Sequence, residues 1–135
     1  MNPRALAADV GTAASVAVIL LVALPYAFGT ATAVGAYYEA GILGPQYFGV
    51  AAAVTAIVFR SARTGRTDPA TAAGTALAFG GVMALLAVVW AFSPDPTVVG
   101  GVHTADWFDY HRWLLALTAL VVPVCAGAYA NLVLD

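Results

Sequence analysis

The chain has 135 residues, of which 62% are hydrophobic and only 9% charged, and its formal net charge is −2. Ordinary soluble domains carry roughly 25% charged residues, and a domain of this size cannot bury so much apolar surface in its own core. The composition therefore excludes an ordinary soluble fold. It predicts a single transmembrane domain over residues 1–135, multi-pass in the cell membrane, with the lipid bilayer as its main partner and no nucleic-acid partner.

Four long segments contain no Asp, Glu, Lys, Arg or His. A helix needs about 20 mostly apolar residues to cross a hydrocarbon core about 30 Å thick. Trimmed at Gly, Pro and polar clusters, these segments predict transmembrane helices at about residues 8–28, 45–60, 69–92 and 111–134. The segments are long, rich in alanine and not alternating, which excludes strands. The predicted fold is all-α: a four-helix transmembrane bundle, up-down-up-down, with short hairpin connections.

Local signals refine these helices. The second is the shortest, and we expect Pro45 in its first turn, where a missing N–H costs nothing. Asp68 and Pro69 predict the N-cap and first residue of the third helix. Pro123 lies inside the fourth helix and is expected to bend it.

The arginines predict the orientation. Arg4 precedes the first helix and three more arginines lie in the connection 60–68, whereas the opposite side has only Arg112 among several acidic residues. Because cytoplasmic loops carry the excess of Lys and Arg, both termini and residues 60–68 are expected in the cytoplasm.

Aromatic residues gather at the predicted outer side. All of them except Phe59, Phe79 and Tyr129 fall near it. An interfacial belt explains part of this pattern, but belts form at both faces of a membrane. If the protein recognises a partner, we expect recognition on this outer face.

Histidine, aspartate and arginine side chains cluster on the same side, in the segment 103–112. The candidate outer-face interaction site comprises Glu39, His103, Asp106, Asp109, His111 and Arg112. Imidazole and carboxylate suit a transition metal, but the spacing matches no known ligand signature, so no metal site is assigned. The simpler interpretation is an amphipathic lead-in to the fourth helix, anchored by its aromatic residues.

Arg112 and Glu39 lie on different predicted loops. An ion pair between them would pin the two outer connections together, and Asp109, three residues before Arg112, is the alternative partner. The opposing interpretation is two solvated charges that never meet.

Several motifs are absent from the sequence. The central part of each predicted span holds no ionisable residue, unlike proton relays and ion-coupled carriers. No phosphate-binding loop, dinucleotide fingerprint or HExxH motif occurs, and Cys125 is the only cysteine. We expect no enzyme activity, no catalytic residue and no cofactor.

Three short strings together resemble a group of small four-helix membrane proteins of haloarchaea: Ala36-Tyr37-Tyr38 with Gly41, the segment 66–70, and Tyr110-His111-Arg112-Trp113. All five basic residues are arginine and aspartate is abundant, which agrees with a halophilic source. The resemblance supports the topology and implies no activity, cofactor or catalytic residue.

Two functions follow as expectations. The first is a non-enzymatic accessory subunit or scaffold that engages a partner, another membrane protein or a further copy of the chain, through the aromatic outer face. The second is a small-molecule or metal-binding membrane protein that uses the outer-face Glu, His and Asp residues.

Overall fold

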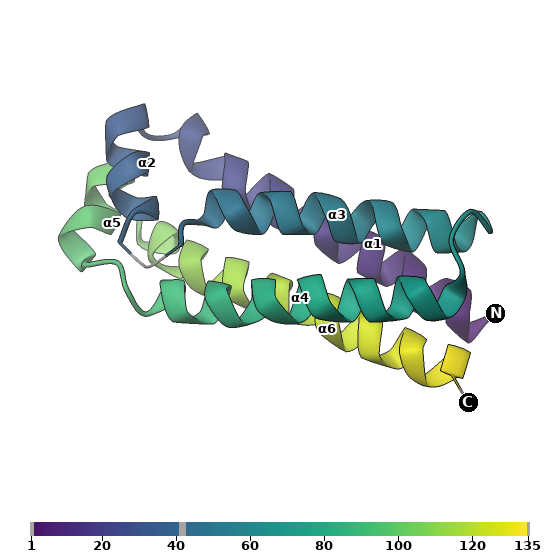
Figure 1. Ribbon diagram of the computed structural model, residues 1–135. Helices are drawn as coiled ribbons and strands as arrows, with labels where there is room; N and C mark the ends of the chain where they lie inside the picture. Colours follow the sequence, from purple (N-terminus) through teal and green to yellow (C-terminus); the bar gives the residue numbers. More distant parts are fainter. Residues whose placement is uncertain (1, 41–42, 135) are drawn as a thin grey trace.

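The chain is all-helical (Figure 1). The computed structural model describes residues 2–40 and 43–134, so Gly41 of the sequence motif lies outside the described residues, and no strand occurs within these ranges. In chain order the α-helices and the 3₁₀ helices, labelled η, are α1 (Pro3–Ala23), η1 (Leu24–Ala27), α2 (Ala31–Tyr38), α3 (Pro45–Arg63), α4 (Pro69–Ala91), α5 (Pro96–Val102), η2 (Asp106–Tyr110) and α6 (His111–Leu134).

The long helices α1, α3, α4 and α6 run side by side, and the short ones gather at the end opposite the two termini (Figure 1). α1 packs against α3 and α6, and α4 packs against the same two helices. Three stretches of the described chain, Pro3–Ala27, Pro69–Ala91 and Asp106–Leu134, are long and apolar enough to cross a membrane. α3 is not among them, since its sequence includes Gln46, Ser61 and two arginines.

Caps and prolines explain where the long helices begin and end. The Asn2 side chain accepts from the N–H of Arg4, so α1 begins several residues before the predicted position 8. It gives way to η1 at Leu24, because Pro25 has no N–H to continue the α-helical ladder. Asp68 caps α4 through the N–H of Thr71, as an N-cap before proline should.

The connections differ from the expected short hairpins. Only α3 and α4 are joined by a short loop. The other two connections contain η1 with α2, and α5 with η2, and α2 contacts α5. We call these residues, 24–38 and 96–110, the cap.

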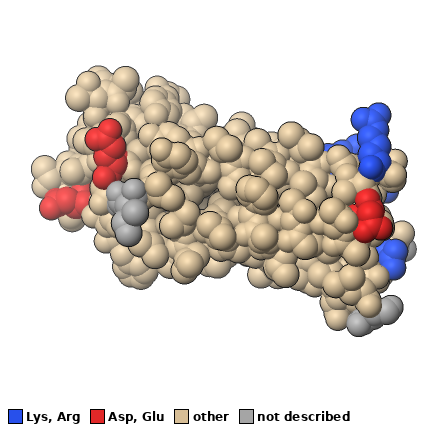
Figure 2. Space-filling model, viewed as in Figure 1, with Lys and Arg blue, Asp and Glu red and all other residues tan. Residues whose placement is uncertain are grey.

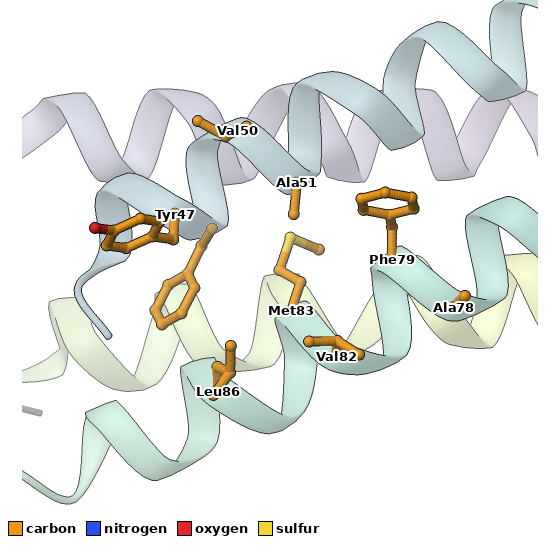
Figure 3. Close-up of a pocket in the computed structure, with 9 residues that line it drawn as sticks. Tyr47, Val50, Ala51, Ala78, Phe79, Val82, Met83 and Leu86 are labelled. Atoms are coloured by element: carbon orange, nitrogen blue, oxygen red, sulfur yellow. The ribbon is translucent and has the colours of Figure 1, made fainter. Parts of the chain in front are cut away.

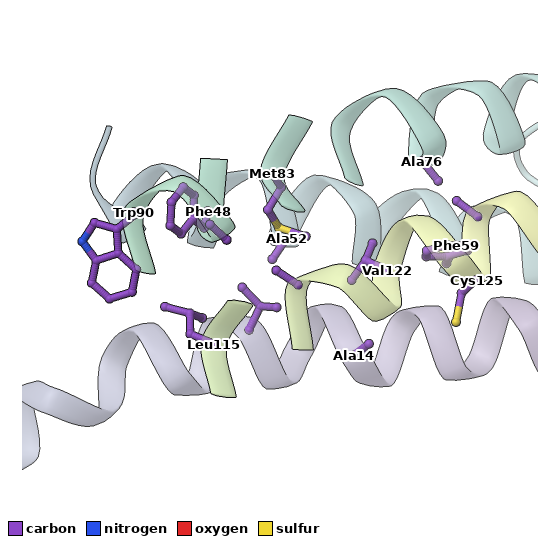
Figure 4. Close-up of a cluster of buried hydrophobic side chains, with 14 of the residues drawn as sticks. Ala14, Phe48, Ala52, Phe59, Ala76, Met83, Trp90, Leu115, Val122 and Cys125 are labelled. Carbon is purple, nitrogen blue, oxygen red and sulfur yellow. The ribbon is translucent and has the colours of Figure 1, made fainter. Parts of the chain in front are cut away.

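Small residues let the long helices approach closely, around a core of buried apolar side chains (Figure 4). A Cβ on Gly11 of α1 would lie 2.5 Å from the ring of Phe59, which is buried. Gly80 of α4 faces Pro123 of α6, where a Cβ would lie 3.3 Å from the proline nitrogen. Pro123 therefore sits inside α6 at a point of close approach and does not end the helix.

Charged side chains lie at the two ends of the molecule (Figure 2). The arginines seen there gather at the end that carries the termini, which we call the arginine end, and the middle of that face shows no charge. Arg63 Nε pairs with Asp9 Oδ1 at 3.0 Å, joining α3 to α1. Arg4 donates to the carbonyl of Leu132, joining α1 to α6.

Candidate functional site

His111 connects the cap to two long helices. It is the first residue of α6 and only 2% of its surface is exposed. Its Nε2 lies 2.7 Å from the carbonyl oxygen of Leu21, and its Nδ1 lies 2.8 Å from the hydroxyl oxygen of Tyr37. A carbonyl can only accept, so Nε2 carries a proton and donates to Leu21. When the ring is neutral, its Nδ1 accepts from the Tyr37 hydroxyl.

A proline makes the Leu21 carbonyl available. In an α-helix this oxygen would accept from the N–H of residue 25, and Pro25 has none. The N–H of Leu24 donates instead to Leu20. His111 therefore satisfies an acceptor that α1 leaves open, which ties the end of α1 to the start of α6.

Tyr37 and Tyr38 of α2 extend this network. The indole N–H of Trp90, at the end of α4, donates to the carbonyl of Tyr37 at 3.2 Å. The Tyr38 hydroxyl donates to the carbonyl of Val22 in α1. Burial raises the pKa of both tyrosines well above their usual value, so both hydroxyls remain protonated donors.

Aromatic rings fill the space around this network. The Phe108 ring stacks on His111 with centroids 5.2 Å apart and planes 6° apart, and Trp90 lies 5.0 Å from Tyr37. The buried aromatic residues of this end are Tyr37, Tyr38, Phe48, Trp90 and Phe108. Part of the aromatic excess seen in the sequence therefore packs in the interior, between the cap and the ends of α3 and α4, and does not lie at the membrane surface.

A second group of rings lies on the surface of the cap. Phe28, His103 and Trp107 meet at centroid distances of 5.2, 5.3 and 5.5 Å, and we call them the aromatic surface cluster. Phe28 is 46% exposed and Trp107 is 48% exposed. His103 Nδ1 accepts from the N–H of Ala105, which fixes the orientation of its ring. The cluster thus presents half-exposed rings held in edge-to-face contact.

The structure separates the candidate residues predicted from the sequence. Glu39, Asp106 and Asp109 are exposed, whereas His111 is buried with both ring nitrogens hydrogen-bonded. Within residues 2–40 and 43–134, no three His, Cys, Asp or Glu side chains gather as metal ligands. The candidate outer-face site therefore stays a prediction, and the burial of His111 leaves His103 as the histidine that a ligand at this face could reach.

The predicted ion pair of Arg112 was wrong. Arg112 pairs with neither Glu39 nor Asp109 within 4.0 Å, and Arg63–Asp9 is the ion pair found across the described residues. The Arg112 guanidinium lies 5.6 Å from the Trp113 ring centroid, and its Nη1 is buried without a hydrogen-bond partner. The connection that the pair was expected to make is made by His111 and Tyr37.

Between α3 and α4 a hollow of about 380 Å³ opens on the side of the molecule (Figure 3). Phe48 is part of its lining. Tyr47 lies at one end, and Met83 and Phe79 face α3 from α4. The lining is almost entirely apolar, as expected for a surface that faces lipid tails or another helix.

Sequence reasoning missed Tyr37, Trp90 and the backbone acceptor Leu21. One sequence signal was available for Leu21, because a proline four residues after it must leave its carbonyl free. No local pattern indicates that residue 111 reaches this carbonyl, since the contact joins residues 90 positions apart.

The fold and site define an all-helical protein with helices long and apolar enough to cross a membrane. The chain belongs to a family of unknown function, DUF7548, whose profile matches residues 1–134. No curated protein and no solved structure matches it significantly.

Proposed function

We propose that the chain is a multi-pass membrane protein whose α1, α3, α4 and α6 form a four-helix transmembrane bundle, up-down-up-down, with both termini in the cytoplasm. The antiparallel order of the four packed helices supports this arrangement. The concentration of arginines at the end with the termini supports the orientation. The cap then lies at the outer surface of the cell membrane.

α3 crosses in this arrangement although its own hydropathy is lower. Its 19 residues span about 28 Å at 1.5 Å per residue, close to the hydrocarbon thickness. Its buried Thr55 is hydrogen-bonded to Ser15 of α1, with 2.7 Å between the hydroxyl oxygens. Its arginines lie in the last turn, where long side chains reach the headgroups.

We further propose that the protein is a non-enzymatic accessory subunit or scaffold, and that it engages another membrane protein through the aromatic surface cluster. The observation that carries this proposal is the half-exposed pair Phe28 and Trp107, held on a cap whose interior is fixed by buried hydrogen bonds. Preordered aromatic rings supply contact area at low entropic cost, and they are enriched in protein interfaces.

Purification from native membranes in a mild detergent, followed by mass spectrometry, tests this proposal. A partner should copurify with the wild type and be lost when Phe28→Ala and Trp107→Ala are combined. Phe79→Ala is the matched control, since Phe79 is 45% exposed but lies on α4, away from the cap. Equal recovery of the partner with both variants would overturn the proposed surface.

A further inference from the structure

A second hollow, of about 490 Å³, lies between α1 and α3 at the arginine end. Part of its lining is apolar and comes from Val16 of α1 and from Ala56 and Ile57 of α3. Arg60 and Arg66 also line it, together with the hydroxyl side chains of Thr12, Ser61 and Thr64. One hollow thus combines apolar walls with two cations.

The C-terminal turn of α3 places Arg66 over this hollow. Gly65 has a φ of +76°, the left-handed conformation that favours glycine. The N–H of Arg66 donates to the carbonyl of Ser61 at 2.9 Å, and the N–H of Gly65 donates to Ala62 at 3.3 Å. This is the Schellman motif, which folds the chain back on the last turn of the helix. This turn brings Arg66 to the same hollow that Arg60, in the last turn of α3, also lines.

Nearby carboxylates are already engaged. Asp9 is paired with Arg63, which does not line the hollow. Asp68 accepts from the backbone N–H and the hydroxyl of Thr71. Neither Arg60 nor Arg66 forms an ion pair within the described residues, and both are exposed. The lining of the hollow therefore carries a positive charge that no ion pair within the described residues balances.

From this geometry we propose that the hollow binds one anionic glycerophospholipid, with its phosphate between Arg60 and Arg66 and one hydrocarbon chain along Val16 and Ile57. Ile57 is 65% exposed, so a hydrocarbon chain lying along it would bury apolar surface. A lipid supplies an anion and a hydrocarbon chain at this depth, whereas a free phosphate supplies only the anion. Arginine favours such phosphate contacts because its planar guanidinium bonds two oxygens at once.

The inference rests on the proposed membrane embedding, and it is independent of the proposed partner and of the orientation. Its test uses the purified chain alone, so the partner proposal can fail while lipid binding holds. Native mass spectrometry of the detergent-solubilised protein, with equal amounts of phosphatidylglycerol and phosphatidylcholine, measures lipid selectivity directly. We expect a 1:1 adduct that strongly favours phosphatidylglycerol.

Single charge substitutions locate the headgroup. Arg60→Gln and Arg66→Gln should each lower the phosphatidylglycerol-to-phosphatidylcholine ratio about fivefold, the effect of one basic residue near an anionic headgroup. Arg4→Gln removes the same charge from the same end but outside the hollow, and should change the ratio less than twofold. An equal loss in all three variants would overturn the site in favour of a general charge effect. No loss in the first two would overturn it as well.

Two further measurements test the apolar part. Ala56→Phe places a ring in the apolar part of the hollow without changing the charge, and should abolish the adduct. If this variant does not fold, Ile57→Ser, at a more exposed position, should weaken the adduct instead. Glycerol phosphate at millimolar concentration should not displace phosphatidylglycerol from the wild type. Displacement of phosphatidylglycerol by glycerol phosphate would show a site for anions alone. An adduct retained by a folded Ala56→Phe protein would show that the lipid binds elsewhere.

Discussion

Replacing His111 with phenylalanine should destabilise the protein by about 2–4 kcal/mol. Phenylalanine keeps the ring and its stacking on Phe108, so the change removes mainly two hydrogen bonds. It leaves the Tyr37 hydroxyl and the Leu21 carbonyl without the hydrogen bond that each forms with His111. Each buried polar group left without a hydrogen bond lowers the free energy of unfolding by about 1–2 kcal/mol. The loss is nearer the lower value where lipid or water reaches the group. Tyr37→Phe removes only one of the bonds and should cost about half as much.

The free energy of unfolding can be measured by titration with SDS in mixed micelles, followed by near-UV circular dichroism. Tyr129→Phe is the control, since Tyr129 is a buried tyrosine of α6 whose hydroxyl forms no hydrogen bond within the described residues. A rescue makes the test specific: in the His111→Phe background, Pro25→Ala restores an N–H that can bond the Leu21 carbonyl, and should recover about 1 kcal/mol. If His111→Phe costs no more than Tyr129→Phe, or Pro25→Ala gives no recovery, our account of this network is wrong.

Three further predictions concern topology, packing and metal content. In whole cells, an impermeant thiol reagent should label Thr97→Cys and leave Thr64→Cys unlabelled, both in a Cys125→Ala background, and the reverse pattern would invert the orientation. Gly11→Ala should cost about 1–3 kcal/mol in SDS unfolding because its Cβ meets Phe59. Gly74→Ala should be neutral or stabilising, because beyond its own stretch of helix no described atom lies within 4 Å of the new Cβ. Elemental analysis of the purified protein should find less than 0.1 metal ion per chain, and one ion per chain would favour a metal-binding function.

Helical character could be predicted because it depends on local composition. Three signals are visible in the sequence without knowledge of tertiary contacts: the long apolar segments, Asp68 before Pro69, and the arginines after residue 59. The cap was not predicted. Its helices α2 and α5 have only eight and seven residues, too short for a periodic signal, and they are stabilised by packing against each other.

Site residues were harder to predict because their roles depend on distant partners. His111 looked like a surface ligand, yet it is buried between residues of α1 and α2 that precede it by 90 and 74 positions. Opposite charge favoured an ion pair between Arg112 and Glu39, but the fold does not bring these two side chains within 4.0 Å of each other. The aromatic excess was visible in the sequence, whereas its division into a buried core and an exposed cluster depends on the fold.

Site-specific photocrosslinking in native membranes tests the central claim most directly. The photoreactive residue p-benzoylphenylalanine is placed at position 107 in the aromatic surface cluster, or at position 79 on α4 as a control with similar exposure. We predict one discrete protein adduct from position 107, identified by mass spectrometry as another membrane protein or a second copy of the chain, and none of that mass from position 79. The absence of a discrete adduct at position 107, or the same adduct from both positions, would contradict the account.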